Sequence, residues 1–94
     1  MPWIRGFVWD DDENVAHIGR HQVSPDEVEE ALTGNPVILR GPDGRYLAYG
    51  RTATGRVLFA VYVQRPGGRI RILTAREMTE KEKRFYRKKR KERG

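Results

Sequence analysis

The spacing of apolar and polar residues along the chain changes from a helical period to a strand period near residue 36. Before this point, a short apolar strand from Trp3 to Trp9 precedes two predicted amphipathic helices, over residues 11–21 and from Pro25 to the Gly34-Asn35-Pro36 stop. After it, apolar segments alternate with turn compositions, which predicts strands over residues 37–40, 45–52, 57–64 and 69–75. Their connections are so short that only an antiparallel meander fits.

Two capping boxes predict where two of the helices begin. Ser24 with Glu27 opens the second helix, and Thr79 with Glu82 opens a C-terminal helix that docks through Met78, Phe85 and Tyr86. From Arg87 onward no residue is apolar, so this tail is expected to fray or project. The predicted fold class is α+β: one domain over residues 1–86, made of a strand, two helices, a four-stranded antiparallel meander and a basic helix, then a basic tail over residues 87–94.

Length and composition limit the number of domains and the cellular compartment. Ninety-four residues without cysteine indicate one domain with no disulfides and no thiolate metal site, at home in a reducing compartment. No apolar run approaches the roughly 20 residues of a membrane span, and the N-terminus lacks the pattern of a signal peptide. A cytoplasmic protein without membrane contact is expected.

The charges are segregated. The net charge of +6 equals that of residues 80–93 alone, and the remaining chain is neutral. Acids dominate between Asp10 and Glu30, whereas arginines dominate between Arg40 and Arg76. Such a chain is expected to have a basic surface that attracts a polyanion and an acidic flank.

Arginines form the first candidate constellation. Alternation with Ile70 and Ile72 places Arg69 and Arg71 on one face of a strand, and Arg76 follows where this strand is expected to run into a helix. Arginine binds phosphate through a rigid fork of donors, and interleaved tyrosines could stack on bases. The plainer interpretation is a solvated sheet face. The set comprises Arg45, Arg51, Arg65, Arg69, Arg71 and Arg76, with Tyr46, Tyr49 and Tyr62 interleaved.

Glu13, His17 and His21 form the second constellation, spaced four residues apart along one predicted helix. Such groups can bind a metal, but three successive turns rarely converge on one ion. Pairing of Glu13 with His17 is the more common outcome, so no metal site is predicted. A single histidine that transfers protons fits better, because imidazole titrates near neutral pH.

Short motifs span nearly the whole chain in a consistent order: Phe7-Val8-Trp9-Asp10, His21 to Glu29, Gly50-Arg51, Val61-Tyr62, Arg69 to Arg76, and Glu82 to Tyr86. They resemble those of the BrnT-type toxins of bacterial type II toxin–antitoxin pairs, which have the RelE-like ribonuclease fold. The family more often has glycine after the histidine, where this chain has Gln22, and its Asn-x-x-Lys-His grouping is replaced here by His17-Ile18-Gly19-Arg20-His21.

The resemblance implies an endoribonuclease that cleaves cellular RNA without metal or cofactor and is silenced by a cognate antitoxin, which also makes any DNA contact. Cleavage through the 2′-hydroxyl needs a base, an acid and cations around the phosphorus. We expect Arg71 and Arg76 to stabilise the phosphate, with Arg51 or Arg65 as a third cation. His21 is expected to be the acid or base, with Tyr86 or Glu77 second. The expected RNA-binding residues are Arg45, Arg65, Arg69, Lys88, Lys89 and Arg90.

Several alternatives stay open. The same arginine face would serve a nucleic-acid-binding module without catalysis, or a protein-interaction domain that docks an acidic partner. For His21, the structural alternative is a helix C-terminal histidine stabilised by the helix dipole. A homodimer also remains an option.

Overall fold

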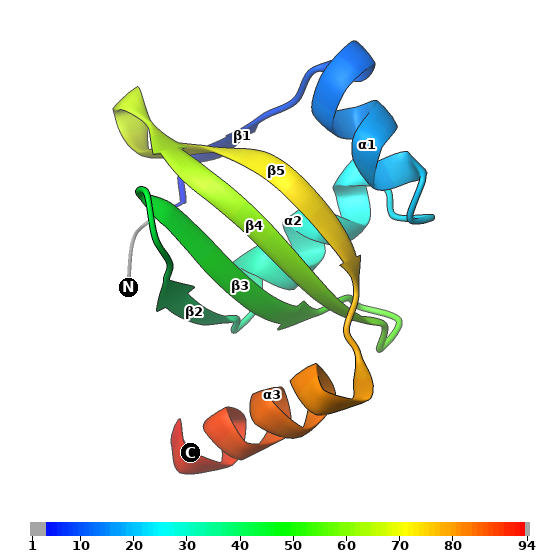
Figure 1. The fold of residues 1–94 in the computed structure, drawn as a ribbon, viewed down its shortest axis with the longest axis vertical. Coiled ribbons are helices and arrows are strands. Elements are labelled where there is room, and N and C mark those ends of the chain that lie inside the picture. Colours follow the sequence, from blue (N-terminus) through cyan, green and yellow to red (C-terminus); the bar gives the residue numbers. More distant parts are fainter. Residues whose placement is uncertain (1–3, 94) are drawn as a thin grey trace.

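A single five-stranded sheet organises the computed structural model, which describes residues 4–93 (Figure 1). The strand order is β1-β5-β4-β3-β2. Trp3, which the sequence placed in the first strand, lies outside the described residues. The strands are β1 (Gly6–Val8), β2 (Val37–Arg40), β3 (Arg45–Arg51), β4 (Val57–Arg65) and β5 (Arg69–Glu77).

The strands from β2 to β5 follow one another in antiparallel pairs, as their short connections require. β1 adds a fifth strand at the edge of β5, and this pair is parallel. The first strand was predicted from the sequence, but its place in the sheet was not. A parallel pair needs a long connection, and here both N-terminal helices and three strands lie between β1 and β5.

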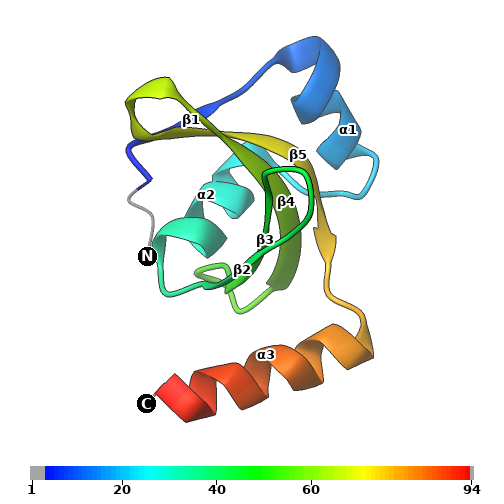
Figure 2. The ribbon, with the colours of Figure 1, turned by 60° about the vertical axis from the view of Figure 1, so that its left-hand side comes forward.

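The helices lie on two sides of the sheet (Figures 1 and 2). A π-helical turn (Asp11–Val15) leads into α1 (Ala16–Gly19), so the first predicted helix is present but ends two residues early. α2 (Pro25–Thr33) lies behind the sheet in Figure 1, and α3 (Glu80–Arg93) crosses one end of the opposite face. We call this opposite face, on the side away from α2, the open face.

Local hydrogen bonds explain where the helices begin. Asp10 accepts bonds from the backbone of Asp12 and Glu13, and both predicted capping boxes are formed. α2 ends at the predicted Gly34, but Gly34 has φ −75° and does not use the left-handed conformation that the sequence analysis assigned to it. Pro36, which cannot continue a helix, is the remaining reason for the stop.

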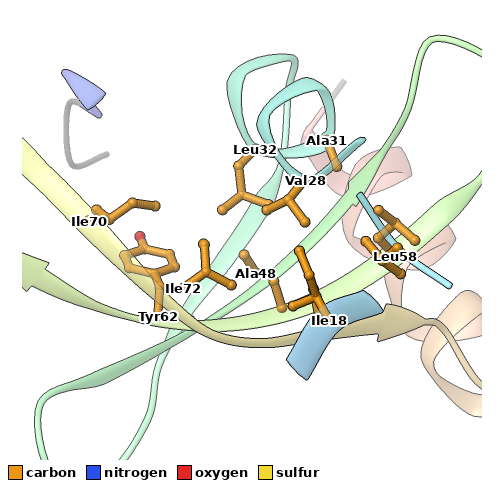
Figure 3. Close-up of a cluster of buried hydrophobic side chains, with 12 residues drawn as sticks. Ile18, Val28, Ala31, Leu32, Ala48, Leu58, Tyr62, Ile70 and Ile72 are labelled. Carbon is orange, nitrogen blue, oxygen red and sulfur yellow. The ribbon is translucent and has the colours of Figure 1, made fainter. Parts of the chain in front are cut away.

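The main core lies between the sheet and α2 (Figure 3). Val28, Ala31 and Leu32 point from α2 at the sheet, as predicted, and Ile18 joins them from α1. Tyr62 is fully buried among them and its hydroxyl has no hydrogen-bond partner in the described residues. Burial raises the pKa of this hydroxyl to about 12, so Tyr62 stays neutral.

A second, smaller core holds α3 against the open face. Met78 and Tyr86 pack there on Val37 and Tyr49. The basic tail expected from Arg87 onward belongs to this helix as far as Arg93. Its cations also cover aromatic rings, since the Arg90 guanidinium lies 5.5 Å from the centre of the Tyr86 ring.

Candidate active site on the open face of the sheet

All six arginines of the predicted set lie on the open face. Residues that pair directly across two strands point to the same face of a sheet, as do alternate residues along one strand. Each arginine of the set pairs with, or belongs to, the alternate residues of β4 that point to the open face. The tyrosines do not accompany them: Tyr46 and Tyr62 stack on each other on the core side, and Tyr49 is buried beneath α3. Tyr49 and Tyr62 are therefore too buried to stack on bases, and half-exposed Tyr46 faces away from the arginines. The arginines and their neighbours are Arg45 beside Val63, Arg51 beside Val57, Arg65 beside Arg69, Arg71 beside Val63, and Arg76 beside Phe59.

A β-bulge in β5 brings Arg71 and Arg76 to the same face. Strict alternation would place residues 71 and 76 on opposite faces. The register shifts where Val61 pairs with Thr74 and Tyr62 pairs with Ile72, which leaves Leu73 as the extra residue. Arg76 was expected where the strand runs into a helix, but it lies within β5. The bulge therefore aligns Arg71, Thr74 and Arg76 along one strand.

Arg71 is held by a carboxylate from the N-terminal helical segment. Its Nη2 donates to Glu13 Oε2 at 2.6 Å, and its side chain is only 18% exposed. The predicted pairing of Glu13 with His17 is wrong, because Glu13 turns to this guanidinium. A guanidinium keeps its charge at any physiological pH and is the stronger partner. The other donors of Arg71 have no partner among the described residues.

One histidine contacts this part of β5, and the second packs against the first. His17 Nε2 is 3.1 Å from Thr74 Oγ1, so α1 places one imidazole against the strand just beyond the bulge. The ring centres of His17 and His21 are 5.5 Å apart and the rings meet edge to face. His21 is exposed. No group of three metal-binding side chains lies together in residues 4–93.

The turn that carries His21 is fixed by Arg56, which the sequence analysis did not single out. Val23 N donates to Ile18 O, and Gln22 N donates to Gly19 O, a helix-ending arrangement with Gln22 in the left-handed region at φ 60°. Arg56 Nη1 donates to Gln22 O at 2.7 Å and to both Glu27 oxygens at 2.9 Å. No local pattern marks Arg56, because its partners lie far away in sequence.

Glycine at position 22 is expected to stabilise the protein. The left-handed conformation costs a side-chain-bearing residue roughly 1–2 kcal/mol, which glycine avoids at some cost in chain entropy. We expect Gln22→Gly to raise the free energy of unfolding by up to about 1 kcal/mol in urea titrations. Arg20→Gly is the control, since Arg20 has φ −65° and glycine should destabilise there. A Gln22→Gly protein no more stable than its parent would contradict this account.

Glu77 lies on the opposite face of the sheet from Arg71. It pairs across the sheet with Leu58 and therefore faces the core side, where its carboxylate lies 3.5 Å from Arg56 Nη2. Although it is the next residue after Arg76, it does not join the Arg71 site. The structure therefore does not place Glu77 as the alternative acid or base beside Arg71.

Arg76 ties β5 to the first turn of α3. Its two terminal nitrogens donate to the Glu82 carboxylate at 2.7 and 3.0 Å, and its guanidinium lies 4.7 Å from the centre of the Phe59 ring. Bonding to Arg76 lowers the pKa of Glu82, and bonding to Arg56 lowers the pKa of Glu27.

Acid is therefore expected to destabilise the fold through these two carboxyls. Because the pKa of each is lower in the folded protein than the ordinary 4.5, each contributes stability above that pH. This contribution is lost as the pH falls through the folded-state values. Urea titrations from pH 7 to pH 3 should show the free energy of unfolding falling below about pH 4.5. The double variant Glu27→Gln, Glu82→Gln should show a flatter profile, and an unchanged slope in this variant would exclude these carboxyls as the cause.

The remaining predicted residues lie in two other places. Arg51, Tyr86 and Arg90 meet beyond α3, where Tyr86 is 4% exposed and its hydroxyl accepts a bond from Arg90 Nη1 at 3.4 Å. Lys88 is exposed on α3, and the ammonium of Lys89 lies 5.9 Å from the centre of the Phe85 ring. At the far end of the sheet, β3 begins at Arg45, β4 ends at Arg65 and β5 begins at Arg69.

Together these features define a small basic α+β domain with an arginine-lined sheet face beside two histidines. The family model described as "Ribonuclease toxin, BrnT, of type II toxin-antitoxin system" matches residues 9–82, and the chain belongs to this family. Among solved structures, the Brucella abortus ribonuclease toxin BrnT has a similar fold, with a TM-score of 0.64 and 14% sequence identity. That match covers 80% of this chain and 97% of the Brucella chain. No curated protein sequence matches.

No helix in residues 4–93 is long and apolar enough to cross a membrane.

Proposed function

We propose that this protein is the toxin of a type II toxin–antitoxin pair and acts as a metal-independent endoribonuclease on cellular RNA. Family membership supports the class of activity. The observation that carries the proposal for this chain is the group around the β5 bulge, where Arg71 and Thr74 share a face, His17 contacts Thr74, and His21 packs against His17. A cytoplasmic location fits the proposed substrate.

This group of side chains includes the proton-transferring groups and the cation that cleavage through a 2′-hydroxyl needs. A base removes the proton from the 2′-oxygen, which attacks the adjacent phosphorus, and an acid protonates the departing 5′-oxygen. The products are a 2′,3′-cyclic phosphate and a 5′-hydroxyl. The nucleophile belongs to the RNA itself, so the protein has only to transfer protons and to stabilise the negative charge that grows on the phosphate.

We assign these tasks to three side chains. Arg71 stabilises the phosphate with the donors that Glu13 leaves free. His21, which is exposed, acts as acid or base, and His17 is the second proton-transferring group because its ring lies 5.5 Å from that of His21. Arg76 contributes less than the sequence analysis expected, since Glu82 occupies both of its terminal nitrogens.

The partner is proposed to be a cognate antitoxin that neutralises the protein and makes any contact with DNA. The family description supports a paired antitoxin. The basic end of the sheet, with Arg45, Arg65 and Arg69, is proposed to bind RNA outside the cleaved bond, because these arginines are exposed and have no carboxylate partner in the described residues.

Growth of a bacterial culture after induced expression tests the proposed function. Expression of this chain alone should arrest growth and produce new RNA ends, and His21→Ala should relieve both effects, since proton transfer by a side chain contributes about 10²–10⁴-fold. Soluble parent protein that causes neither arrest nor new RNA ends would overturn the proposal and favour a binding module without catalysis.

A further inference from the structure

A basic pocket lies beyond α3, apart from the Arg71 site. It is open, has a volume of about 450 Å³, and is lined on the sheet side by the end of β3 and the start of β4. We call it the α3 pocket. Its cations are Arg51, Lys83, Arg87, Arg90 and Lys91, and none of its lining residues is an acid.

Helical spacing places this pocket on the other side of α3 from the candidate active site. Lys83, Arg87 and Arg90 are three or four residues apart and form one stripe of the helix. Glu82 and Phe85 form a different stripe, which contacts Arg76 and Tyr49 on the open face. Tyr86 lies between the two stripes and anchors the helix in the second core.

Among the described residues, Lys83 is the one cation of the pocket that has a carboxylate partner, Glu80 at 3.3 Å. Arg56, Arg71 and Arg76 are each paired with at least one glutamate. Arg51 and Arg87 have no hydrogen bond or ion pair among the described residues, yet both line the same pocket. Like charges held close together repel each other, and an anion bound between them would relieve this repulsion.

We propose that the α3 pocket binds backbone phosphates of the RNA strand outside the cleaved bond. The inference rests on the proposed function, because it takes RNA as the ligand. Guanidinium groups bind phosphate through two parallel bonds, and the pocket presents three arginines from two separate elements. Arg51 was expected to be a third catalytic cation, and the pocket gives it a binding role instead.

The burial of Tyr86 indicates that the pocket recognises phosphates and not bases or a protein partner. At 4% exposure, its ring offers no face for a base to stack on and no apolar anchor for a protein partner. Recognition in this pocket is therefore electrostatic and independent of base sequence. It extends the binding surface of the open face to the other side of α3.

Binding of a 2′-O-methyl oligonucleotide of about 12 nucleotides tests this inference without cleavage. The dissociation constant is measured at several salt concentrations for the parent and for the double variant Arg51→Gln, Arg87→Gln. Losing two phosphate contacts should weaken binding roughly tenfold and make the salt dependence shallower by about 1.4, at about 0.7 per contact for single strands. Inorganic phosphate, added as a competitor, should displace little of the oligonucleotide, because one phosphate cannot replace several contacts.

The matched control is Arg40→Gln, Arg84→Gln, which removes the same two charges outside the pocket. This control should bind nearly as tightly as the parent. Equal losses in the two double variants would show a general charge effect and overturn the inference, as would a parent that does not bind the oligonucleotide. A parent that binds through the pocket but never cleaves RNA would support this inference while the proposed catalysis fails.

Discussion

Replacing Arg71 with alanine is expected to lower the rate of RNA cleavage by about 10²–10³-fold, the usual cost of losing one donor to a developing oxyanion. The guanidinium keeps donors free on the face of β5 that carries Thr74, whereas Arg76 on the same face is bonded to Glu82 through both terminal nitrogens. Folding should be little affected, because the Glu13 left behind is 69% exposed and can be hydrated. The rate is measured with purified protein and a short RNA, with thermal unfolding as the check on the fold.

Glu13→Gln separates a direct role of Arg71 from a structural one. If Arg71 served only to hold the N-terminal helical segment, removing its carboxylate partner would cause a similar loss of cleavage. We expect Glu13→Gln to retain cleavage, since the arginine and its free donors stay in place. Matching losses in Arg71→Ala and Glu13→Gln would remove Arg71 from the phosphate site.

Replacing Gly50 with alanine is expected to destabilise the fold by about 3 kcal/mol, near the upper end for overpacking of a core. A Cβ built at Gly50 would lie 2.2 Å from the carbonyl oxygen of Ala31, and backbone cannot give way as a flexible side chain can. α2 would have to move off β3, which would disrupt the main core. For a domain of this size, the midpoint of thermal unfolding should fall by roughly 10–20 °C.

Gly19→Ala is the matched control for this prediction. Nothing lies within 4 Å of a Cβ at Gly19, which is in α1 and exposed. Alanine should leave stability unchanged or raise it by up to about 1 kcal/mol through its helix propensity. A Gly50→Ala protein as stable as Gly19→Ala would show that the close approach of α2 to β3 is not needed.

Local signals in the sequence predicted much of this fold. Ser24 with Glu27, and Thr79 with Glu82, identified the starts of α2 and α3 because both partners of a capping box lie within four residues. Alternation and turn residues located four strands within two residues of their ends. The pairing of β1 with β5 depends on contacts about 60 residues apart, and no local pattern carries that information.

The site was predicted only in part, for the same reason. The arginines were identified by residue type, but the bulge at Leu73 decides that Arg71 and Arg76 share a face, and alternation alone predicts the opposite. The partners of these arginines were also missed, since Glu13 lies 58 residues from Arg71 in the sequence. The presence of Gln22, where the BrnT family more often has glycine, is a difference that the structure explains, because the backbone there is left-handed.

The chemistry of the RNA ends tests the central claim most directly. Purified protein is incubated with RNA in the presence of a chelator, and the ends of the fragments are identified by mass spectrometry. We expect 2′,3′-cyclic phosphate and 5′-hydroxyl ends, formed by the parent and lost in both His21→Ala and Arg71→Ala. Intact RNA with the folded parent, or 5′-phosphate ends that require an added divalent metal, would contradict the proposed mechanism.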